Sequence, residues 1–298
     1  MNVGSPDGED SRREEILLSG AAAEQAVRVF AAGQADLVVG GTFADLPAAL
    51  GVKLPRGALR FDPASGLFGL VPVRRGGALD DAEVRRLLSQ AIDRDALTDA
   101  LRVPGLVARA TVLEPGLEGV AEPTQPAWLA TPIATRRVTL TAEAARLFGS
   151  EKPTIRVYLR DGPGADILFD HLAADWGAIG LTTERAKSAS SAADFKLIDA
   201  VAPSTSPAWF LRQFRCQFAT VCDTQADELL DAARDTLVAA QRGALMSQAA
   251  GRIDDAQLFI PLAAPVRWSL VSNRIQGFVG NRFARHTLTD LEQKPAGG

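Results

Sequence analysis

The sequence is poor in the residues that build most metal sites. It has two cysteines, and its only histidines are His171 and His286, so a metal site is not expected. Cys216 and Cys222 lie close together in "CQFATVC", where a disulfide is plausible in an oxidising compartment. Two separate, half-buried thiols are the alternative, and the spacing does not decide between them.

An excess of positive charge and long apolar runs are also missing. The 32 Lys and Arg residues are outnumbered by 36 Asp and Glu residues, and the net charge of −4 argues against nucleic-acid binding. There is no run of 18 apolar residues, so no membrane span is expected. The start, "MNVGSPDGEDSRREE", lacks the basic beginning and apolar centre of a signal peptide. As written, the chain would stay in the cytoplasm.

Familiar catalytic motifs are absent as well. The sequence has no G-x-S-x-G elbow, P-loop, G-x-G-x-x-G after a strand or H-E-x-x-H. His171 lies near Asp170 and Asp175, either of which could orient it as a general base. A surface histidine on an amphipathic helix is the simpler interpretation. Paired acids lie at helix ends, where carboxylates serve as caps: Asp80–Asp81, Asp93 with Asp95, and Asp254–Asp255. We expect no enzyme; a hydrolase with an unrecognised site is the weakest alternative.

The elements that the sequence does contain are those of an α/β protein. Residues 15–18 predict a strand, and "AAAEQAVRVFAAGQADLVVGG" predicts a helix closed by Gly33 and then a short buried strand. "DDAEVRRLLSQAIDRDALTDAL" predicts a helix with Asp80 and Glu83 as a capping box, and a second short helix capped by Asp95. Residues 104–132 predict a long ordered loop or crossover.

A βαβ unit follows this loop and leads to a loop rich in hydroxyl groups. "TAEAARLFG" predicts a helix; "PTIRVYL", "GADILFDHLAADWGAIG" and "LTTERA" then predict a strand, a helix and a strand with a right-handed crossover. "FKLIDAV" predicts the next strand, which ends at "PSTSP". Trp209 follows that loop, and Trp268 lies beside Arg267. Both suit a pocket for a polar organic ligand, and burial in the core is the alternative for both.

Four stretches, taken together, resemble the solute-binding proteins of ABC importers, in the peptide- and nickel-binding class (family 5 type). They are "AVRVFAAGQADLVVGG", "ALDDAEVRRLLSQAIDRDALTDAL", "IRVYL…LAADWGAIGLTTE", and the C-terminal run from "ELLDAARDTL" through "LFIPLAAPVRWSLV" to "IQGF…HTLTDL". The resemblance covers roughly residues 20–291. It implies an α/β, two-lobed fold like that of periplasmic binding proteins of class II, with the N-terminal part of the fold missing.

The resemblance also implies a division of the chain and a location. A partial lobe I would comprise residues 15–103 and 256–291, lobe II would comprise 104–255, and 1–14 and 292–298 would be disordered tails. Family members carry an N-terminal portion of comparable length, so the chain is expected to be a truncated product or a fragment of a longer exported protein. The implied location is the periplasm, although this chain shows no signal peptide.

The hydroxyl-rich loop departs from the family's ligand loop. Where the family reads Trp, then Asp-Tyr, then Asp-Pro, this sequence has Ala200, Pro203, Ser204 and Ser206. The acid that meets the amine of a bound peptide is therefore gone, and Asp199 is the nearest carboxylate.

A neutral or anionic solute is the expectation that follows from this change. The hydroxyls of the loop would donate hydrogen bonds, Trp209 would stack, and Arg212 would meet a carboxylate. A plain turn with no ligand is the alternative. The candidate ligand-binding residues are Gly41, Thr42, Asp199, Ser204, Thr205, Ser206, Trp209 and Arg212.

The expected partners are a peptide or other small solute and an ABC permease in the inner membrane, with no cofactor and no nucleic acid. The alternative is a truncated, ligand-free module for protein–protein interaction. A chain that lacks half a lobe would expose sheet edges and apolar surface, which a partner chain or a homodimer through lobe I could cover.

Overall fold

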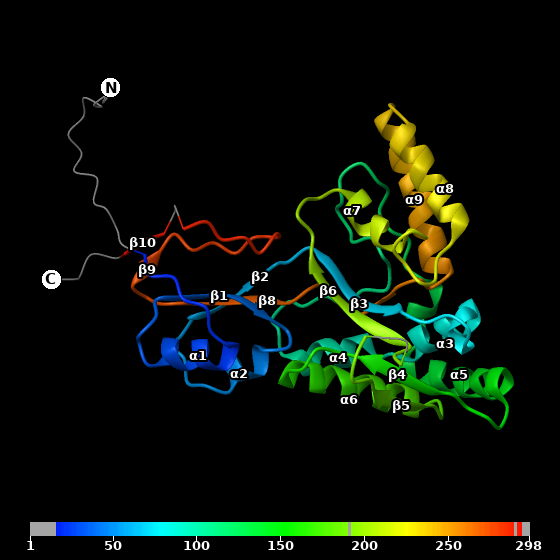
Figure 1. Ribbon diagram of the computed structural model, residues 1–298, viewed down its shortest axis with the longest axis horizontal. Helices are drawn as coiled ribbons and strands as arrows, with labels where there is room; N and C mark the ends of the chain where they lie inside the picture. The colour runs from blue at the N-terminus through cyan, green and yellow to red at the C-terminus, as the bar shows by residue number, and fades with distance from the viewer. Residues whose placement is uncertain (1–15, 190–191, 289–290, 294–298) are drawn as a thin grey trace.

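The computed structural model describes residues 16–189, 192–288 and 291–293. The predicted tail 1–14 and most of the tail 292–298 lie outside these residues. Two sheets lie beside each other with helices packed against them, as Figure 1 shows. None of the described helices is long and apolar enough to cross a membrane.

The larger sheet has five strands in the order β5-β4-β6-β3-β7. β4, β5 and β6 are parallel, whereas β3 runs antiparallel to both β6 and β7. The strands are β3 (Gly66–Pro72), β4 (Thr154–Tyr158), β5 (Thr182–Arg185), β6 (Phe195–Val201) and β7 (Ile260–Pro261).

Helices cover both faces of this sheet because its central strand β3 is apolar on both sides. Phe68 and Leu70 pack into one hydrophobic cluster, and Leu67 and Val71 pack into another, as the two-residue period of a strand requires. The first cluster is covered by α3 (Ala82–Ala91), α4 (Arg94–Leu101), α5 (Ile133–Phe148) and α6 (Pro163–Gly177). The second is covered by α7 (Pro207–Leu211), α8 (Thr224–Asp235) and α9 (Ala239–Asp255).

The smaller sheet has three strands in the order β1-β8-β2, all antiparallel. Its strands are β1 (Leu37–Thr42), β2 (Leu59–Asp62) and β8 (Arg267–Val271), and α1 (Ala23–Ala31) and α2 (Leu46–Leu50) pack against it. A two-stranded pair joins β9 (Ile275–Gln276) to β10 (Glu292–Gln293), and short 3₁₀ helices lie at Ala78–Asp80, Ala127–Ala130 and Arg212–Phe214.

The chain crosses between the two sheets twice, from β2 to β3 and from β7 to β8, and the sheets also touch directly. The rings of Phe43 and Phe68 meet edge to face at 4.8 Å, and one hydrophobic cluster runs through both parts. The N–H of Gly164, in the first turn of α6, donates to the carbonyl of Ala44 at 2.8 Å. A Cβ on Gly164 would lie 1.9 Å from the carbonyl oxygen of Phe43, so only glycine allows this close approach.

Several predicted elements are confirmed. β4, α6 and β5 form the predicted unit with parallel strands, and β6 covers the predicted residues 195–201. Residues 104–132 form a long connection whose regular structure is limited to one 3₁₀ turn and an isolated bridge between Ala108 and Ala263.

Other predictions are wrong in ways that local chemistry explains. Residues 16–18 form no strand. None of the described strands pairs with them, and their side chains are exposed. α3 is capped by Asp81, whose carboxylate accepts from the N–H of Glu83 at 2.7 Å, rather than by Asp80. α4 is capped by Asp93, which accepts from the N–H of Ala96, rather than by Asp95.

The division of the chain into lobes stays a prediction. Within the predicted lobe I, strand β3 pairs along its whole length with β6 of the larger sheet and is buried on both faces.

Candidate functional site

Strands β4 and β6 are parallel but staggered. The end of β4, at Val157 and Tyr158, pairs with the start of β6, at Phe195 and Lys196, so β6 runs on beyond β4. Arg160 follows β4, and Asp199 lies near the end of β6, before the hydroxyl-rich loop. Burial raises the pKa of Asp199; Arg267 opposes that rise most, and Arg160 is close enough to oppose it more weakly. Arg160 is exposed and forms no ion pair within the described ranges, so its guanidinium faces solvent, next to Asp161 in the chain.

Asp199 connects the two sheets through an ion pair with Arg267 of β8. Nη1 of Arg267 lies 2.7 Å from Oδ1 of Asp199, and Nη2 donates to the Asp199 carbonyl at 3.3 Å. Burial raises the pKa of the Asp199 carboxyl, and the charge of Arg267 opposes that shift. A ligand that used Asp199 would therefore have to compete with Arg267 for it.

Gly41 and Thr42 end β1 opposite Trp268 and Arg267 of β8. A Cβ on Gly41 would lie 2.1 Å from the Trp268 ring, so the glycine makes room for the indole. The indole N–H of Trp268 donates to the Thr42 carbonyl at 2.8 Å, and the side chain is 1% exposed. Trp268 is therefore a core residue. Thr42 Oγ1 donates to Asp45 at 3.0 Å.

The hydroxyl-rich loop is fixed at its base and open at its tip. The N–H of Ala202 donates to the carbonyl of Ser65, in the β2–β3 connection, at 2.8 Å. Ser204 and Ser206 are exposed and Thr205 is half-buried. The N–H of Ser206 is 3.4 Å from Oγ of Ser204, a weak internal contact that leaves the hydroxyls available to other groups.

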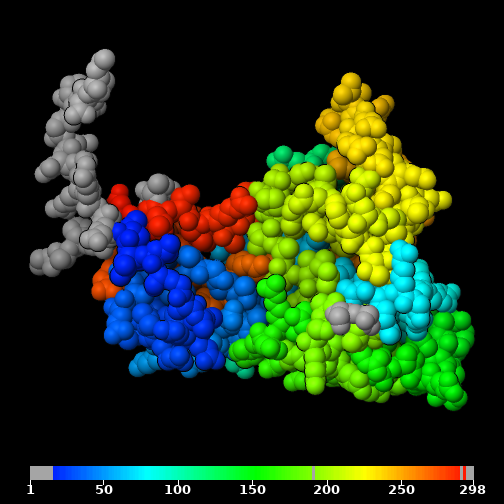
Figure 2. Space-filling model, viewed as in Figure 1, coloured from blue at the N-terminus to red at the C-terminus, as the bar shows by residue number. Residues whose placement is uncertain are grey.

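Trp209 and Arg212 lie just after this loop, in α7 and the turn that follows. Trp209 is half-buried, meets Phe210 edge to face at 5.1 Å, and packs on the cluster under α7, α8 and α9. Arg212 is exposed. In Figure 2 the yellow-green segment that contains this stretch lies between the red C-terminal segment and the yellow to orange α8–α9 pair.

The predicted ligand residues therefore fall into two groups. Arg267 brings Gly41, Thr42 and Asp199 together, whereas the loop 204–206, Trp209 and Arg212 form a second group in one continuous segment. Neither group lines any of five cavities that the placed residues form. The cavity nearest to them, of about 290 Å³, lies at the two connections between the sheets and includes Arg267.

A buried carboxylate at these connections was not expected from the sequence. Glu114 is 4% exposed and accepts from the hydroxyl of Ser65 and from Arg109; Arg282 reaches it at 3.2 Å. Glu114 thus ties the β2–β3 connection to the long loop and to the C-terminal segment. Glu114 lies in a proline-rich loop that carries no local signal for such a role, whereas Arg160, directly after an apolar strand, could have been found by its position.

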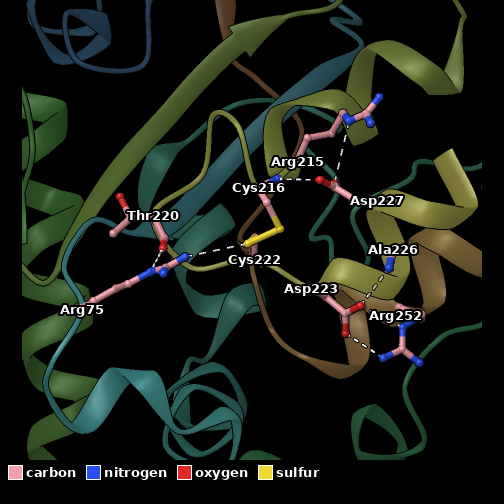
Figure 3. Close-up of a disulfide and its surroundings, with 9 residues drawn as sticks. All are labelled: Arg75, Arg215, Cys216, Thr220, Cys222, Asp223, Ala226, Asp227 and Arg252. Carbon is pink, nitrogen blue, oxygen red and sulfur yellow. Dashed lines mark hydrogen bonds and ion pairs between the residues drawn. A yellow bond between two sulfur atoms is a disulfide. The ribbon is translucent and has the colours of Figure 1, made fainter. Parts of the chain in front are cut away.

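The disulfide that the sequence left open is formed. Cys216 is bonded to Cys222 across six positions, as Figure 3 shows. The N–H of Cys216 donates to Asp227 at 3.0 Å, and Nη2 of Arg75 lies 3.8 Å from Sγ of Cys222. The bridge closes the segment between α7 and α8, directly after the candidate ligand residues.

Both histidines have internal partners. His171 Nε2 lies 3.0 Å from the Asp93 carbonyl and 3.5 Å from Asp175, so this half-buried residue joins α6 to the start of α4. His286 lies 3.1 Å from Asp62 and stacks on Phe278, which fixes the C-terminal segment to β2. No group of three or more metal-ligating side chains exists in the described part of the chain.

Comparison with known proteins identifies relatives at the level of sequence and of fold. No family model matches the chain. It is 25% identical over 243 residues to "Probable di/tripeptide-binding protein 5" of Pseudomonas aeruginosa, an alignment that covers 72% of this chain and 44% of the relative.

Two solved structures have a similar fold. The Escherichia coli murein tripeptide binding protein MppA matches with a TM-score of 0.78 and 14% identity, over 90% of this chain and 56% of that one. Burkholderia pseudomallei OppA matches with a TM-score of 0.77 and 20% identity, over 92% and 57%. The chain thus spans about half the length of these relatives. The predicted resemblance is confirmed for the fold: over the part that it spans, the chain has the fold of the two-lobed solute-binding proteins of the peptide- and nickel-binding class.

Proposed function

We propose that this chain, with the fold of the peptide-binding class of solute-binding proteins, captures a small polar solute between its two sheets and delivers it to an ABC permease. The observation that carries the proposal is the second half of β6. There Asp199 is paired with Arg267, which lies opposite Thr42 of β1; Arg160 is close enough to act on Asp199, and the hydroxyl-rich loop follows the strand. Relatives of the same fold are binding proteins by name, which fits capture without chemistry. The corresponding location is the periplasm.

The charges around the second half of β6 favour a solute with a carboxylate. Arg160 is exposed and forms no ion pair with a described residue, whereas Asp199 is already paired with Arg267. A free guanidinium and hydroxyl donors suit a carboxylate; a peptide amine would find no free acid in the loop 203–206. We therefore expect a peptide-like or other small solute that is bound through its acidic end, with Trp209 against its apolar part.

The Asp199–Arg267 pair would act in the closure of the two parts. It joins β6 to β8 across the two chain connections, and movement about those connections would stretch or restore it. Because both side chains are 16% exposed, a solute that excludes the remaining water would strengthen the pair. Solute binding and closure would thus favour each other.

The experiment is a binding panel read by calorimetry and by the shift in melting temperature. It compares free dipeptides, N-acetylated dipeptides and dipeptide amides, which lack the carboxylate. We expect binding that survives N-acetylation and is lost on amidation. Arg160→Gln should weaken binding roughly 10- to 100-fold, since a hydrogen bond to a charged group is worth about 1.5–3 kcal/mol. Arg28→Gln, an exposed arginine of α1, is the control and should bind normally. Equal affinity of amides and acids, or equal loss in both variants, would remove the support for this site.

The second candidate function is a protein-interaction module, which one observation favours. β1 and β2 are both edge strands of a three-stranded sheet, and Ile16, Leu17 and Leu18 beside it are exposed. A partner chain, or a second copy in a homodimer, would cover this surface. Light scattering distinguishes the candidates: a monomer whose melting temperature rises with a solute supports capture, and a stable dimer that ignores every solute supports the module.

A further inference from the structure

A second cavity lies away from Arg160, Asp199 and the hydroxyl-rich loop. It is formed between the 111–128 stretch of the long loop and the end of α9. Its volume is about 570 Å³, within the range of small-molecule sites. Leu113, Pro123 and Trp128 give it an apolar wall, and Asp254 and Gln257 line the opposite side. The cavity is therefore apolar on one side and carries hydrogen-bond acceptors on the other.

Gln257 presents a buried acceptor without a donor. The residue is 7% exposed, and its Nε2 donates to the Asp254 carbonyl at 2.5 Å, which fixes the orientation of the amide. Oε1 is buried and receives no hydrogen bond from any described residue. Because buried polar atoms are nearly always paired, this oxygen points to a donor that comes from outside the chain.

Asp254 presents a second acceptor in the same cavity. Its Oδ1 accepts from the N–H of Val112 at 2.8 Å, and no described residue donates to Oδ2. Burial, and less strongly the charge of Asp255, raises the pKa of Asp254 to about 7. A carboxyl in this state gains most from a ligand that brings a positive charge.

The other charged groups around the cavity do not neutralise Asp254. Arg86 of α3 is exposed and donates to the Asp255 carbonyl at 2.9 Å, and Glu122 of the long loop adds negative charge. Arg85 is buried behind Gln257 and donates to main-chain carbonyls there, at distances between 2.6 and 3.1 Å. Neither arginine forms an ion pair with Asp254.

We propose that this cavity is a binding site for a small organic ammonium ion, whose N–H groups donate to Asp254 Oδ2 and Gln257 Oε1 while its hydrocarbon part lies against Leu113 and Trp128. A metal ion fits less well because no group of three or more metal-ligating side chains occurs within the described ranges. The site is independent of the proposed solute site, since the two share no residue.

The test uses putrescine as the probe and calorimetry on the whole chain at pH 6 and pH 8. The ionised fraction of a carboxyl with a pKa of about 7 rises from roughly one tenth to nine tenths over this range. Putrescine should therefore bind about tenfold more tightly at pH 8. Asp254→Asn keeps an acceptor for Val112 but loses the charge, so it should bind at least tenfold more weakly and without the pH dependence.

Two further variants keep the test sharp. Gln257→Met should weaken binding several-fold while retaining the pH dependence, because it removes one acceptor and no charge. Asp235→Asn, an exposed acid at the end of α8, is the matched control and should bind like the parent chain. Absence of putrescine binding at pH 8, tighter binding at pH 6, or an Asp254→Asn variant that binds normally would each overturn the proposal. Arg160→Gln should leave putrescine binding unchanged, so failure here is separate from failure of the solute site.

Discussion

The closest approach between the two parts of the molecule offers a sharp test of the fold, through Gly164 at the start of α6. An added Cβ would lie 1.9 Å from the Phe43 carbonyl oxygen and 3.0 Å from Cα of Ala44, both main-chain atoms that cannot rotate away. The hydrogen bond from Gly164 to Ala44 would also lengthen. Overpacking of this kind costs about 1–3 kcal/mol, so Gly164→Ala should lower the free energy of unfolding by that amount.

The same helix provides the matched control. Gly177, the last residue of α6, is exposed, and a Cβ there would meet nothing within 4 Å. Gly177→Ala should therefore stabilise the helix by roughly 0.5–1 kcal/mol, as alanine normally does in a helix. The two substitutions make the same chemical change in one helix, and the expected effects have opposite signs.

The assay is urea unfolding followed by circular dichroism and tryptophan fluorescence, with melting temperature as a second measurement. A change of 1 kcal/mol corresponds to roughly 2–4 °C for domains of this size class. If Gly164→Ala unfolds at the same urea concentration as Gly177→Ala, the two parts do not touch at this point and the described packing is refuted.

Three further predictions follow from single contacts. Reducing the Cys216–Cys222 bridge should cost about 2 kcal/mol from its short loop, measured by urea unfolding with and without dithiothreitol; no change would mean that the loop is held by other contacts. Asp223 caps α8, and the hydrogen bond from Arg252 is the chief cause of its lowered pKa. The ionised carboxylate therefore stabilises the folded state above the ordinary aspartate pKa, and this stabilisation is lost as the pH falls through the lowered pKa. Asp223→Ala should therefore cost about 1 kcal/mol at pH 7, and the difference from the parent should vanish in acid; a constant difference would contradict this. Arg267→Met leaves Asp199 buried without its cation, so it should lower the free energy of unfolding by about 3 kcal/mol at pH 7. The loss should be smaller at low pH, because protonation of Asp199 removes the unpaired charge. A loss of stability that grows in acid would exclude this reasoning.

The elements that the sequence predicted well are those whose hydrophobic pattern and turn residues lie close together in the chain. β4, α6 and β5 carry their hydrophobic periods and turns within one short stretch. β6 is a mostly apolar run, interrupted by Lys196 and Asp199, that ends at a proline-bounded loop. The caps show the limit of such patterns. Two aspartates stand close together at both helix starts, Asp80 with Asp81 and Asp93 with Asp95. Which of them caps the helix depends on backbone angles that the sequence does not specify.

The candidate site was predictable only in part, because its contacts are long-range. The sequence located the loop 203–206 but did not place Arg267 against Asp199, 68 positions away, or the buried Glu114 at the connections. The sequence also did not pair β3 with β6, because a strand that is apolar on both faces fits any central position. The sequence suggested only a helix-end role for Asp254 and none for Gln257, because their cavity forms where the distant proline-rich loop packs against the end of α9.

Strand β8 has a consequence for how the protein is made. β1 and β2 pair with β8 and not with each other, so the smaller sheet cannot exist until residue 271 has been synthesised. Until then the early part of the polypeptide leaves the ribosome with two unsatisfied strand edges and an uncovered apolar face. A polypeptide that stops before residue 267 would therefore lose the pairing partner of both early strands together with β8 itself.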